Sequence, residues 1–303
     1  MAKIVGIGAN VCDTLFTVPH YPKEDTKLKA SCVKQSGGGP CATGLVAASK
    51  LGESTAYIGN LTDDGAGLFL KEDMEKYGVS TDFVEIKPGF SSFCSCIFLA
   101  EDSASRTCVF YRGSVPKVEL NEAQKQAIRD AEILMVDGNE LDAAIEGALI
   151  AKQSGTKVLY DAGGLYEGVE NLLPLADYLI PSEEFALGHT KTKTAEEAAK
   201  VLFEKYAPEI VVITQGKKGG IIYDGKTLAS YPAFLVDAVD SNGSGDVFHG
   251  AFAFSAVLGY TVEKACLFAS AVSALKCTKI GARTGVPSYA ETVNFLKERG
   301  IDV

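Results

Sequence analysis

The residues whose types and spacing are best suited to chemistry lie between Asp240 and Asp246. Three small residues, Gly243, Ser244 and Gly245, lead directly into an apolar stretch that predicts a helix. They would leave several backbone N–H groups unpaired at the start of that helix, and those donors together with the helix dipole form a pocket for an anion. Asp246, in the same first turn, is placed to take the proton of a hydroxyl group while the pocket holds a phosphoryl group.

A purely structural explanation of this stretch is an aspartate that complements the helix dipole, with glycines that make a tight turn. That explanation accounts neither for the glycines on both sides of Ser244 nor for the second acid, Asp240. His249, three residues after Asp246, lies on an apolar helix and is expected to be packed and hydrogen-bonded rather than to act as a base. Asp246 is therefore the predicted catalytic residue.

Two other glycine-rich matches are interpreted as decoys. Residues 220–227 fit the phosphate-loop pattern G-x-x-x-x-G-K-[ST], which needs a preceding strand and a following helix. Here residues 221–223 are strand-like, residues 224–225 favour a hairpin turn, and Pro232 follows too soon for a helix. The segment that contains Gly6 and Gly8 lacks the third glycine of a dinucleotide-binding fingerprint.

The elements that must position these residues follow an alternating pattern. Beyond residue 131 the predicted strands and helices are strands at 133–136, 157–160, 178–180 and 210–214, and helices at 143–153, 195–206, 246–258 and 262–277. Such alternation predicts a parallel sheet covered by helices. A β-hairpin is predicted at 93–99 and 106–112. We expect one α/β body that carries a small β excursion formed by two insertions, 13–36 and 90–113.

The composition excludes several classes of protein. The 303 residues carry 29 basic and 39 acidic side chains, and the formal net charge of −10 argues against a general nucleic-acid binder. The sequence has no apolar run of about 18 residues, so no membrane span is predicted, and its N-terminus does not have the shape of a signal peptide. The 8 cysteines form no C-x-x-C pair, which predicts free thiols and a cytoplasmic protein.

The chain resembles the PfkB-type (ribokinase-like) carbohydrate kinases over residues 4–296. The resemblance is carried by motifs in the family's order: Asp13, GGGPCAT at 37–43, the turn at 59–67 with Asp63 and Asp64, TQGKKG at 214–219 and DSNGSGD at 240–246. It implies a ribokinase-like three-layer α/β/α sandwich with a mostly parallel central sheet. In that fold, 1–12, 37–89 and 114–303 would form the core that binds nucleotide and substrate. Residues 13–36 and 90–113 would form a small β-sheet lid.

The resemblance also implies the activity. The protein would be an ATP-dependent kinase that phosphorylates a hydroxymethyl group of a small sugar or sugar derivative. Mg²⁺ would arrive bound to ATP, which agrees with the absence of a visible protein cage for a metal in the sequence. The partners would be the sugar and ATP, with neither nucleic acid nor membrane, and a second copy of the chain would bind through the lid.

The resemblance assigns a role to each matching position. Asp246 is similar to the base that deprotonates the sugar hydroxyl, and Gly243, Ser244 and Gly245 are similar to the hole for the transferred phosphoryl group. The implied sugar-binding positions are Asp13, Lys27, Gly38, Gly39, Thr43 and Arg112. The implied ATP-binding positions are Thr214, Gly216, Gly219, Cys277 and Gly281. Asp240 and Asn242 resemble positions that hold a monovalent cation, potassium, in some members.

The chain departs from the family pattern at two places. Thr43 stands where asparagine is frequent, and residues 182–185 (SEEF) replace the N-x-x-E motif that supports Mg²⁺ and phosphate in many members, with Glu183 as a candidate replacement. A tighter likeness, at 37–43, 245–251 and 274–287, is to the sulfofructose kinase-like branch. Lys27, Arg106 and Arg112 are either solvated lid charges or contacts to an acidic group on the sugar.

Two other functions stay open beside the sugar kinase. One is a nucleoside kinase of the same fold, and the other is a non-catalytic protein that senses a sugar or a nucleotide. Asp246 argues against the second, because a degenerate member of the family would be expected to lose its base. A panel of acceptors with ADP release as the readout separates these functions.

Overall fold

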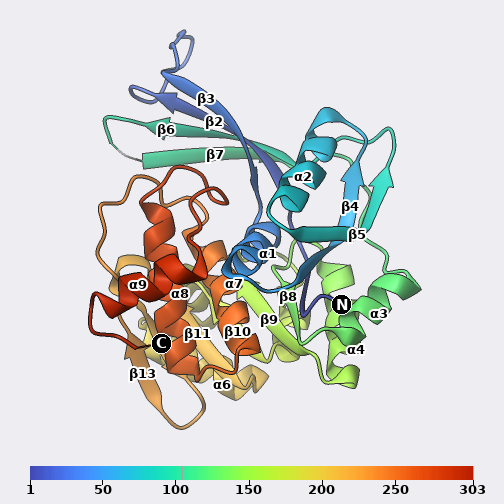
Figure 1. The fold of residues 1–303 in the computed structure, drawn as a ribbon, viewed down its shortest axis with the longest axis vertical. Coiled ribbons are helices and arrows are strands. Elements are labelled where there is room, and N and C mark those ends of the chain that lie inside the picture. Colours follow the sequence, from blue (N-terminus) through green and yellow to red (C-terminus); the bar gives the residue numbers. More distant parts are fainter. Residues whose placement is uncertain (104, 303) are drawn as a thin grey trace.

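The computed structural model describes residues 1–103 and 105–302, and in that part of the chain its larger sheet has nine strands (Figure 1). Their order across the sheet is β13 (Leu228–Tyr231), β12 (Gly220–Tyr223), β11 (Ile210–Thr214), β10 (Tyr178–Pro181), β9 (Lys157–Ala162), β8 (Ile133–Val136), β1 (Ile4–Ile7), β4 (Thr55–Thr62) and β5 (Val79–Lys87). The strands from β11 to β5 are parallel, while β12 and β13 are antiparallel. The mostly parallel sheet predicted from the sequence is therefore confirmed.

β1 lies between β4 and β8 in this sheet. Ile4 pairs with Thr55 on one side and with Ile133 on the other, and all four residues of β1 are buried. Burial on both faces explains why the strand is apolar throughout rather than alternating. Because parallel strands end at the same edge of a sheet, the residues that follow β1, β8 and β9 come together there, and ligands bind at such edges in open α/β sheets.

Helices cover both faces of the sheet. One face packs against α1 (Pro40–Leu51), α2 (Gly65–Lys76), α7 (Ser244–Val257), α8 (Val262–Cys277) and α9 (Tyr289–Lys297), and the other against α3 (Glu122–Asp130), α4 (Leu141–Ser154), α5 (Glu183–Thr190) and α6 (Ala195–Tyr206). Each face has its own apolar core, so the predicted three-layer α/β/α sandwich is confirmed. Among the described residues we find no helix with the length and apolarity that crossing a membrane requires.

The phosphate-loop match at 220–227 is a hairpin, as predicted. β12 and β13 pair antiparallel, with Tyr223 opposite Leu228. The carboxylate of Asp224 closes the turn by accepting the N–H groups of Lys226 and Thr227. No helix follows β13 directly, so the residues of this match cannot surround a phosphate group as a phosphate loop does.

A second sheet of four strands extends from one end of the sandwich, at the top of Figure 1. Its order is β3 (Cys32–Gly38), β2 (Val11–Val18), β6 (Cys94–Ala100) and β7 (Ser105–Tyr111). β6 and β7 form the hairpin predicted from the sequence, and β7 is the exposed outer strand. We call these four strands and their connections the lid. It joins the sandwich through Gly37, Gly38 and Gly39, which run straight into α1.

Candidate active site

The first turn of α7 presents backbone donors to an anion. Gly243 precedes the helix with a φ of 75°, a left-handed conformation that favours glycine. The Ser244 N–H donates to the Ser241 carbonyl oxygen at 3.2 Å, so it closes the turn and is not free for a ligand. Among the described residues the N–H groups of Gly243, Gly245 and Asp246 have no protein acceptor. These donors and the helix dipole make the turn an anion pocket.

Asp246 lies in that turn, partly exposed, near two buried acids. Asp137 follows β8, and Asp161 lies near the end of β9, so the sheet edge brings both carboxyl groups toward α7. Burial raises the pKa of Asp246 to about 7, and the charge of Asp161 adds to the shift, while His249 and Arg106 oppose it. A carboxyl group with that pKa is suited to accept a proton near neutral pH.

His249 fixes α7 onto the sheet. Its Nδ1 lies 2.7 Å from the Gly245 carbonyl oxygen and 3.2 Å from Asp161 Oδ2, and its Nε2 lies 2.8 Å from the Ile180 carbonyl oxygen. Burial lowers the pKa of His249, and the carbonyl oxygens at both ring nitrogens oppose that shift. The prediction of a packed, hydrogen-bonded histidine is confirmed.

Asp137 is a buried acid that sequence patterns did not identify. Its Oδ2 accepts the N–H groups of Ala9 at 2.8 Å and of Cys41 at 3.0 Å, and its Oδ1 accepts that of Asn139 at 2.9 Å. Asp137 therefore ties the loop after β1 to the first turn of α1. Only glycine fits at position 8, because a Cβ there would overlap the Asp137 carboxylate. Nothing local in the sequence links these positions, so only the fold reveals the contact.

The predicted sugar-binding residues Asp13, Gly38, Gly39 and Thr43 lie around the junction of the lid with α1. Asp13, on β2, is buried and accepts a hydrogen bond from Ser95 at 2.6 Å, and burial raises its pKa. A Cβ on Gly38 would overlap the Asp13 carboxylate, and Gly39 has a φ of 91°. The Thr43 hydroxyl is fully buried and has no protein partner among the described residues.

Arg283 connects this junction to the C-terminal part of the chain. Its guanidinium is buried, 2.7 Å from Asp73 on α2, and it donates to the Asn10 side chain at 2.8 Å and to the Gly38 carbonyl oxygen at 2.7 Å. A Cβ on Gly37 would overlap the guanidinium. Two glycines of the triple glycine are therefore explained by close approach, Gly37 to Arg283 and Gly38 to Asp13.

The structure separates the basic residues of the lid. Lys27 lies exposed in the β2–β3 connection, which projects from the free end of the lid, and it forms no ion pair within the described residues (Figure 1). Arg106, on β7, instead donates to the side-chain oxygen of Asn242, in the turn before α7. Arg106 therefore lies at the turn before α7 and Lys27 does not.

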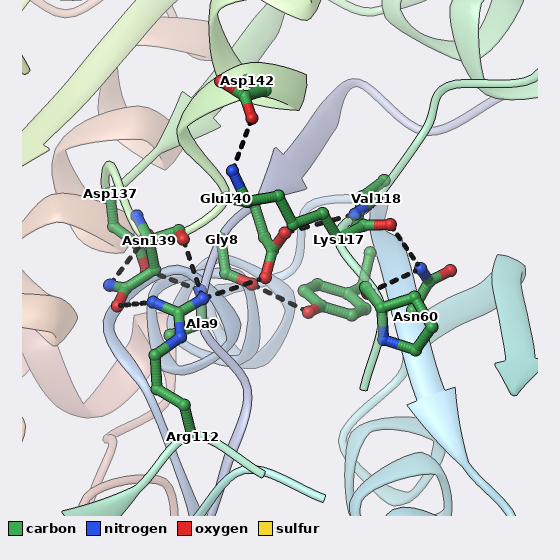
Figure 2. Close-up of polar contacts among 12 residues, drawn as sticks. Gly8, Ala9, Asn60, Arg112, Lys117, Val118, Asp137, Asn139, Glu140 and Asp142 are labelled. Atoms are coloured by element: carbon green, nitrogen blue, oxygen red, sulfur yellow. Dashed lines mark hydrogen bonds and ion pairs between the residues drawn. The ribbon is translucent and has the colours of Figure 1, made fainter. Parts of the chain in front are cut away.

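Arg112, after β7, reaches the edge of the sheet (Figure 2). It donates to the Asn139 carbonyl oxygen at 2.9 Å, lies 3.3 Å from Glu140 Oε1, and stacks over the ring of Phe93. These residues line a pocket of about 360 Å³ that also includes Asn10. The pocket does not include Asp246, but Asn10 and Arg283 connect it to the junction of the lid with α1.

The predicted ATP-binding residues lie at two loops. Thr214 ends β11, and Gly216 and Gly219 follow it with φ values of 56° and 92°. Glu183, at the start of α5, accepts a hydrogen bond from Gln215 at 2.7 Å, so it lies at this loop. That Glu183 replaces the missing N-x-x-E motif stays a prediction.

Cys277 and Gly281 lie beside the turn at 240–244, which precedes α7. The Cys277 carbonyl oxygen accepts the N–H groups of Val239 and Asp240, and the Gly281 N–H donates to Asp240 Oδ2 at 2.8 Å. The segment from Cys277 to Gly281 is therefore held against the turn that ends at α7. This arrangement brings the two loops implied in ATP binding and the predicted base to the same side of the sheet.

The residues assigned to a monovalent cation do not fit one. Asp240 Oδ1 accepts the Asn242 N–H at 2.8 Å, and Oδ2 accepts that of Gly281. The ammonium group of Lys276 lies 3.9 Å from Oδ2 and donates to the Asp240 carbonyl oxygen. A potassium ion there would have to compete with a lysine of like charge. In the described residues no group of three or more His, Cys, Asp or Glu side chains could hold a metal ion.

Comparisons with known proteins show which family the sequence matches. A family model described as pfkB family carbohydrate kinase matches residues 1–288. A ribokinase of Haemophilus influenzae is 26% identical over 298 residues, covering 96% of this chain and 97% of that protein. A deoxyribokinase of Salmonella typhi is 28% identical over 303 residues, covering 97% of this chain and 98% of that protein.

The fold agrees with solved structures as well. A putative ribokinase from Agrobacterium tumefaciens superposes with a TM-score of 0.92 at 26% identity, covering 98% of each chain. A ribokinase of Arabidopsis thaliana, solved with ribose and ATP, has a TM-score of 0.87 at 24% identity, and covers 98% of this chain and 99% of that one, which supports the fold. The relatives named here do not place the chain in the sulfofructose kinase-like branch.

Proposed function

Because the chain belongs to the pfkB family of carbohydrate kinases, we propose that it transfers the γ-phosphoryl group of ATP to a hydroxymethyl group of a small sugar or sugar derivative. The observation that carries this proposal is Asp246, whose pKa is raised to about 7 and which lies in a turn with free N–H donors. A base that works near neutral pH and a preformed set of donors for an anion are the parts that phosphoryl transfer requires.

In the proposed reaction Asp246 accepts the proton of the sugar hydroxyl while the hydroxyl oxygen attacks the γ-phosphorus. The bond between the γ-phosphorus and the β,γ-bridging oxygen breaks, which gives the sugar phosphate and ADP, and Asp246 later releases the proton to water. The N–H groups of Gly243 and Gly245 donate to the oxygens of the phosphoryl group as it is transferred. Mg²⁺ would enter with ATP and neutralise part of the phosphate charge.

Arg106 is the basic residue of the lid that we place in this site. Its contact with Asn242 holds the outer strand of the lid over the turn, and its charge opposes the upward shift in the pKa of Asp246. A guanidinium at this position can donate to the phosphoryl oxygens as charge develops on them. Lys27, at the free end of the lid, would need a movement of the lid to reach the sugar.

We place the sugar at the junction of the lid with α1. Asp13 is a buried carboxyl group with one hydrogen bond from Ser95, so it has acceptor capacity for sugar hydroxyl groups. Gly38 and Gly39 leave room beside it, and the Thr43 hydroxyl adds an unpaired polar group nearby. Arg112 faces Glu140, so its charge is already compensated without an acidic group on the substrate.

We place ATP between the two loops near Gly216 and Gly281. Thr214 and Gly216 open the first loop, the positive φ values of Gly216 and Gly219 shape it, and Cys277 and Gly281 form the second. The anion pocket of α7 lies next to the second loop, since Gly281 and the turn share hydrogen bonds to Asp240. In the proposed arrangement the terminal phosphate lies between the rest of the nucleotide and Asp246.

The test is a panel of neutral sugars, sugar acids and nucleosides, each incubated with Mg²⁺–ATP, with ADP release and product mass as readouts. We expect turnover with a small sugar and none with nucleosides. Asp246→Asn should abolish that turnover while ATP still protects the protein against heat. A response to nucleosides alone would replace the proposal with the nucleoside kinase, and no turnover with any acceptor would favour a sensing protein.

A further inference from the structure

Lys276, near the end of α8, is a lysine with no exposed surface. Its Nζ donates to the Asp240 carbonyl oxygen at 2.8 Å and lies 3.9 Å from Asp240 Oδ2. Burial lowers the pKa of Lys276, and the Asp240 carboxylate opposes that shift by favouring the ammonium form. Lysine is rarely buried completely unless it is paired, so the contact with Asp240 accounts for its position.

The same helix holds the catalytic turn at a second point. The Ser273 hydroxyl, one helical turn before Lys276, donates to the Ser244 carbonyl oxygen at 2.8 Å. Lys276 and Ser273 lie on one side of α8 because residues three apart in a helix are neighbours. Together they hold the start and the end of residues 240–244, the turn whose far end carries the free N–H donors.

Every oxygen atom of Asp240 already has a donor from the protein. A potassium ion is held by several oxygen atoms at once, yet each carboxylate oxygen of Asp240 already accepts a backbone N–H, and its carbonyl oxygen accepts the lysine. A second positive charge beside the Lys276 ammonium would be repelled in this buried place. The lysine therefore supplies the positive charge that Asp240 requires.

We infer that the ammonium group of Lys276 takes the place of a monovalent cation beneath the 240–244 turn and keeps the anion pocket formed without potassium. The inference rests on the proposed function, because the pocket matters through the phosphoryl group that it holds. A charge attached to the chain is always present, whereas a bound ion stabilises a structure in proportion to its concentration. The kinase is therefore expected to be insensitive to potassium.

The test compares the wild type with Lys276→Met in buffers whose ionic strength is kept constant with KCl or choline chloride. For the wild type we expect turnover to differ by less than about twofold between the two salts, since no ion is bound. For Lys276→Met we expect turnover in choline to fall by about tenfold or more, because a buried carboxylate loses its partner. Potassium or ammonium ions should restore much of that loss by entering the vacated position.

Thermal unfolding gives a readout that does not depend on activity. KCl, compared with choline chloride, should raise the Tm of Lys276→Met and leave that of the wild type unchanged. The matched control is Lys50→Met, because Lys50 also donates to backbone carbonyl oxygens of this region, those of Arg283 and Thr284 at 3.3 Å each. Its Tm should show no specific response to potassium.

Three results would overturn the inference. They are a wild type whose turnover or Tm rises specifically with potassium, a Lys276→Met variant that ignores potassium and ammonium in both measurements, and a potassium response of equal size in Lys50→Met. If Lys276→Met does not fold, the Tm of the wild type in the two salts still tests whether potassium binds. If no acceptor is phosphorylated, the proposed function fails, while the Tm measurements continue to test Lys276 on their own.

Discussion

Arg106 on the lid donates a hydrogen bond to Asn242 in the turn that leads into α7. The two residues are 136 positions apart in the sequence, and their contact fastens the outer strand of the lid to the anion pocket. The charge of the guanidinium also opposes the upward shifts in the pKa of Asp13 and of Asp246. The lid thus contributes a charged group to the candidate site.

Replacing Arg106 with alanine is expected to reduce turnover. Loss of a charged hydrogen bond and of a donor to the phosphoryl group should lower kcat/KM by about tenfold to a hundredfold. Arg106→Lys keeps the charge but not the planar fork, so an intermediate rate is expected. Steady-state kinetics with the acceptor found in the panel measures this, and Arg129→Ala, an exposed arginine on α3, is the control. Equal rates for Arg106→Ala and the wild type would show that Arg106 does not contribute to turnover.

The pH dependence of the reaction should report Asp246. Its pKa of about 7 means that the carboxylate, which is the form able to accept a proton, exists mainly above neutral pH. We therefore expect kcat/KM to fall about tenfold for each pH unit below 7. Removing the neighbouring acid by Asp161→Asn should move the midpoint to lower pH, because one like charge is lost. A midpoint that stays in place would show that Asp161 carries no charge in the working enzyme.

Ionisation of Asp246 should destabilise the folded protein, whereas ionisation of most acidic side chains stabilises it. Its pKa in the folded protein lies above the ordinary value of 3.8, so ionisation costs folding free energy as the pH rises from about 4 to 7. Asp246→Asn is expected to raise the Tm at pH 8 and to change it little at pH 4. Calorimetry at several pH values measures the difference. A variant less stable than the wild type at pH 8 would contradict the raised pKa.

The outer strand of the lid is expected to bind a second copy of the chain. β7 is an edge strand, and Val109 and Phe110 are 63% and 64% exposed although they point to opposite sides of it. Light scattering after size exclusion should give twice the mass of one chain, and Val109→Lys with Phe110→Ser should give one. A wild type that is monomeric at micromolar concentration would contradict this prediction.

The sequence predicted the parts of the fold in which apolar periodicity is strong, and missed those in which it is weak. The buried strands β8 to β11 and the β6–β7 hairpin were predicted within a few residues. α3 was missed because only Gln124 and Ile128 of its nine residues are buried, so no apolar stripe marks it. The capping box of Asn121 and Gln124 is the signal that would have located its start.

The candidate site shows the same division between local and distant information. The turn at 240–246 could be predicted as a candidate site because its glycines and its proposed base, Asp246, are consecutive in the sequence. A short motif is therefore enough to indicate it. The contacts of Lys276 with Asp240, of Asp137 with Ala9 and of Arg283 with Gly38 join segments far apart in the chain. Such contacts depend on how strands are ordered in the sheet, which residue types alone do not specify.

The buried ion pair between Arg283 and Asp73 gives the last prediction. Asp73→Ala leaves a guanidinium that is 1% exposed without its carboxylate, and breaking a buried pair from one side costs about 3–5 kcal/mol of unfolding free energy. Glu209→Ala, which removes the partner of the half-exposed Lys157, should cost less than about 1 kcal/mol. Urea unfolding measures both. Because Arg283 also holds the Gly38 carbonyl oxygen beside Asp13, Asp73→Ala should raise the KM for the sugar more than the KM for ATP. Equal changes in the two KM values would mean that Arg283 stabilises the fold without positioning the sugar-binding loop.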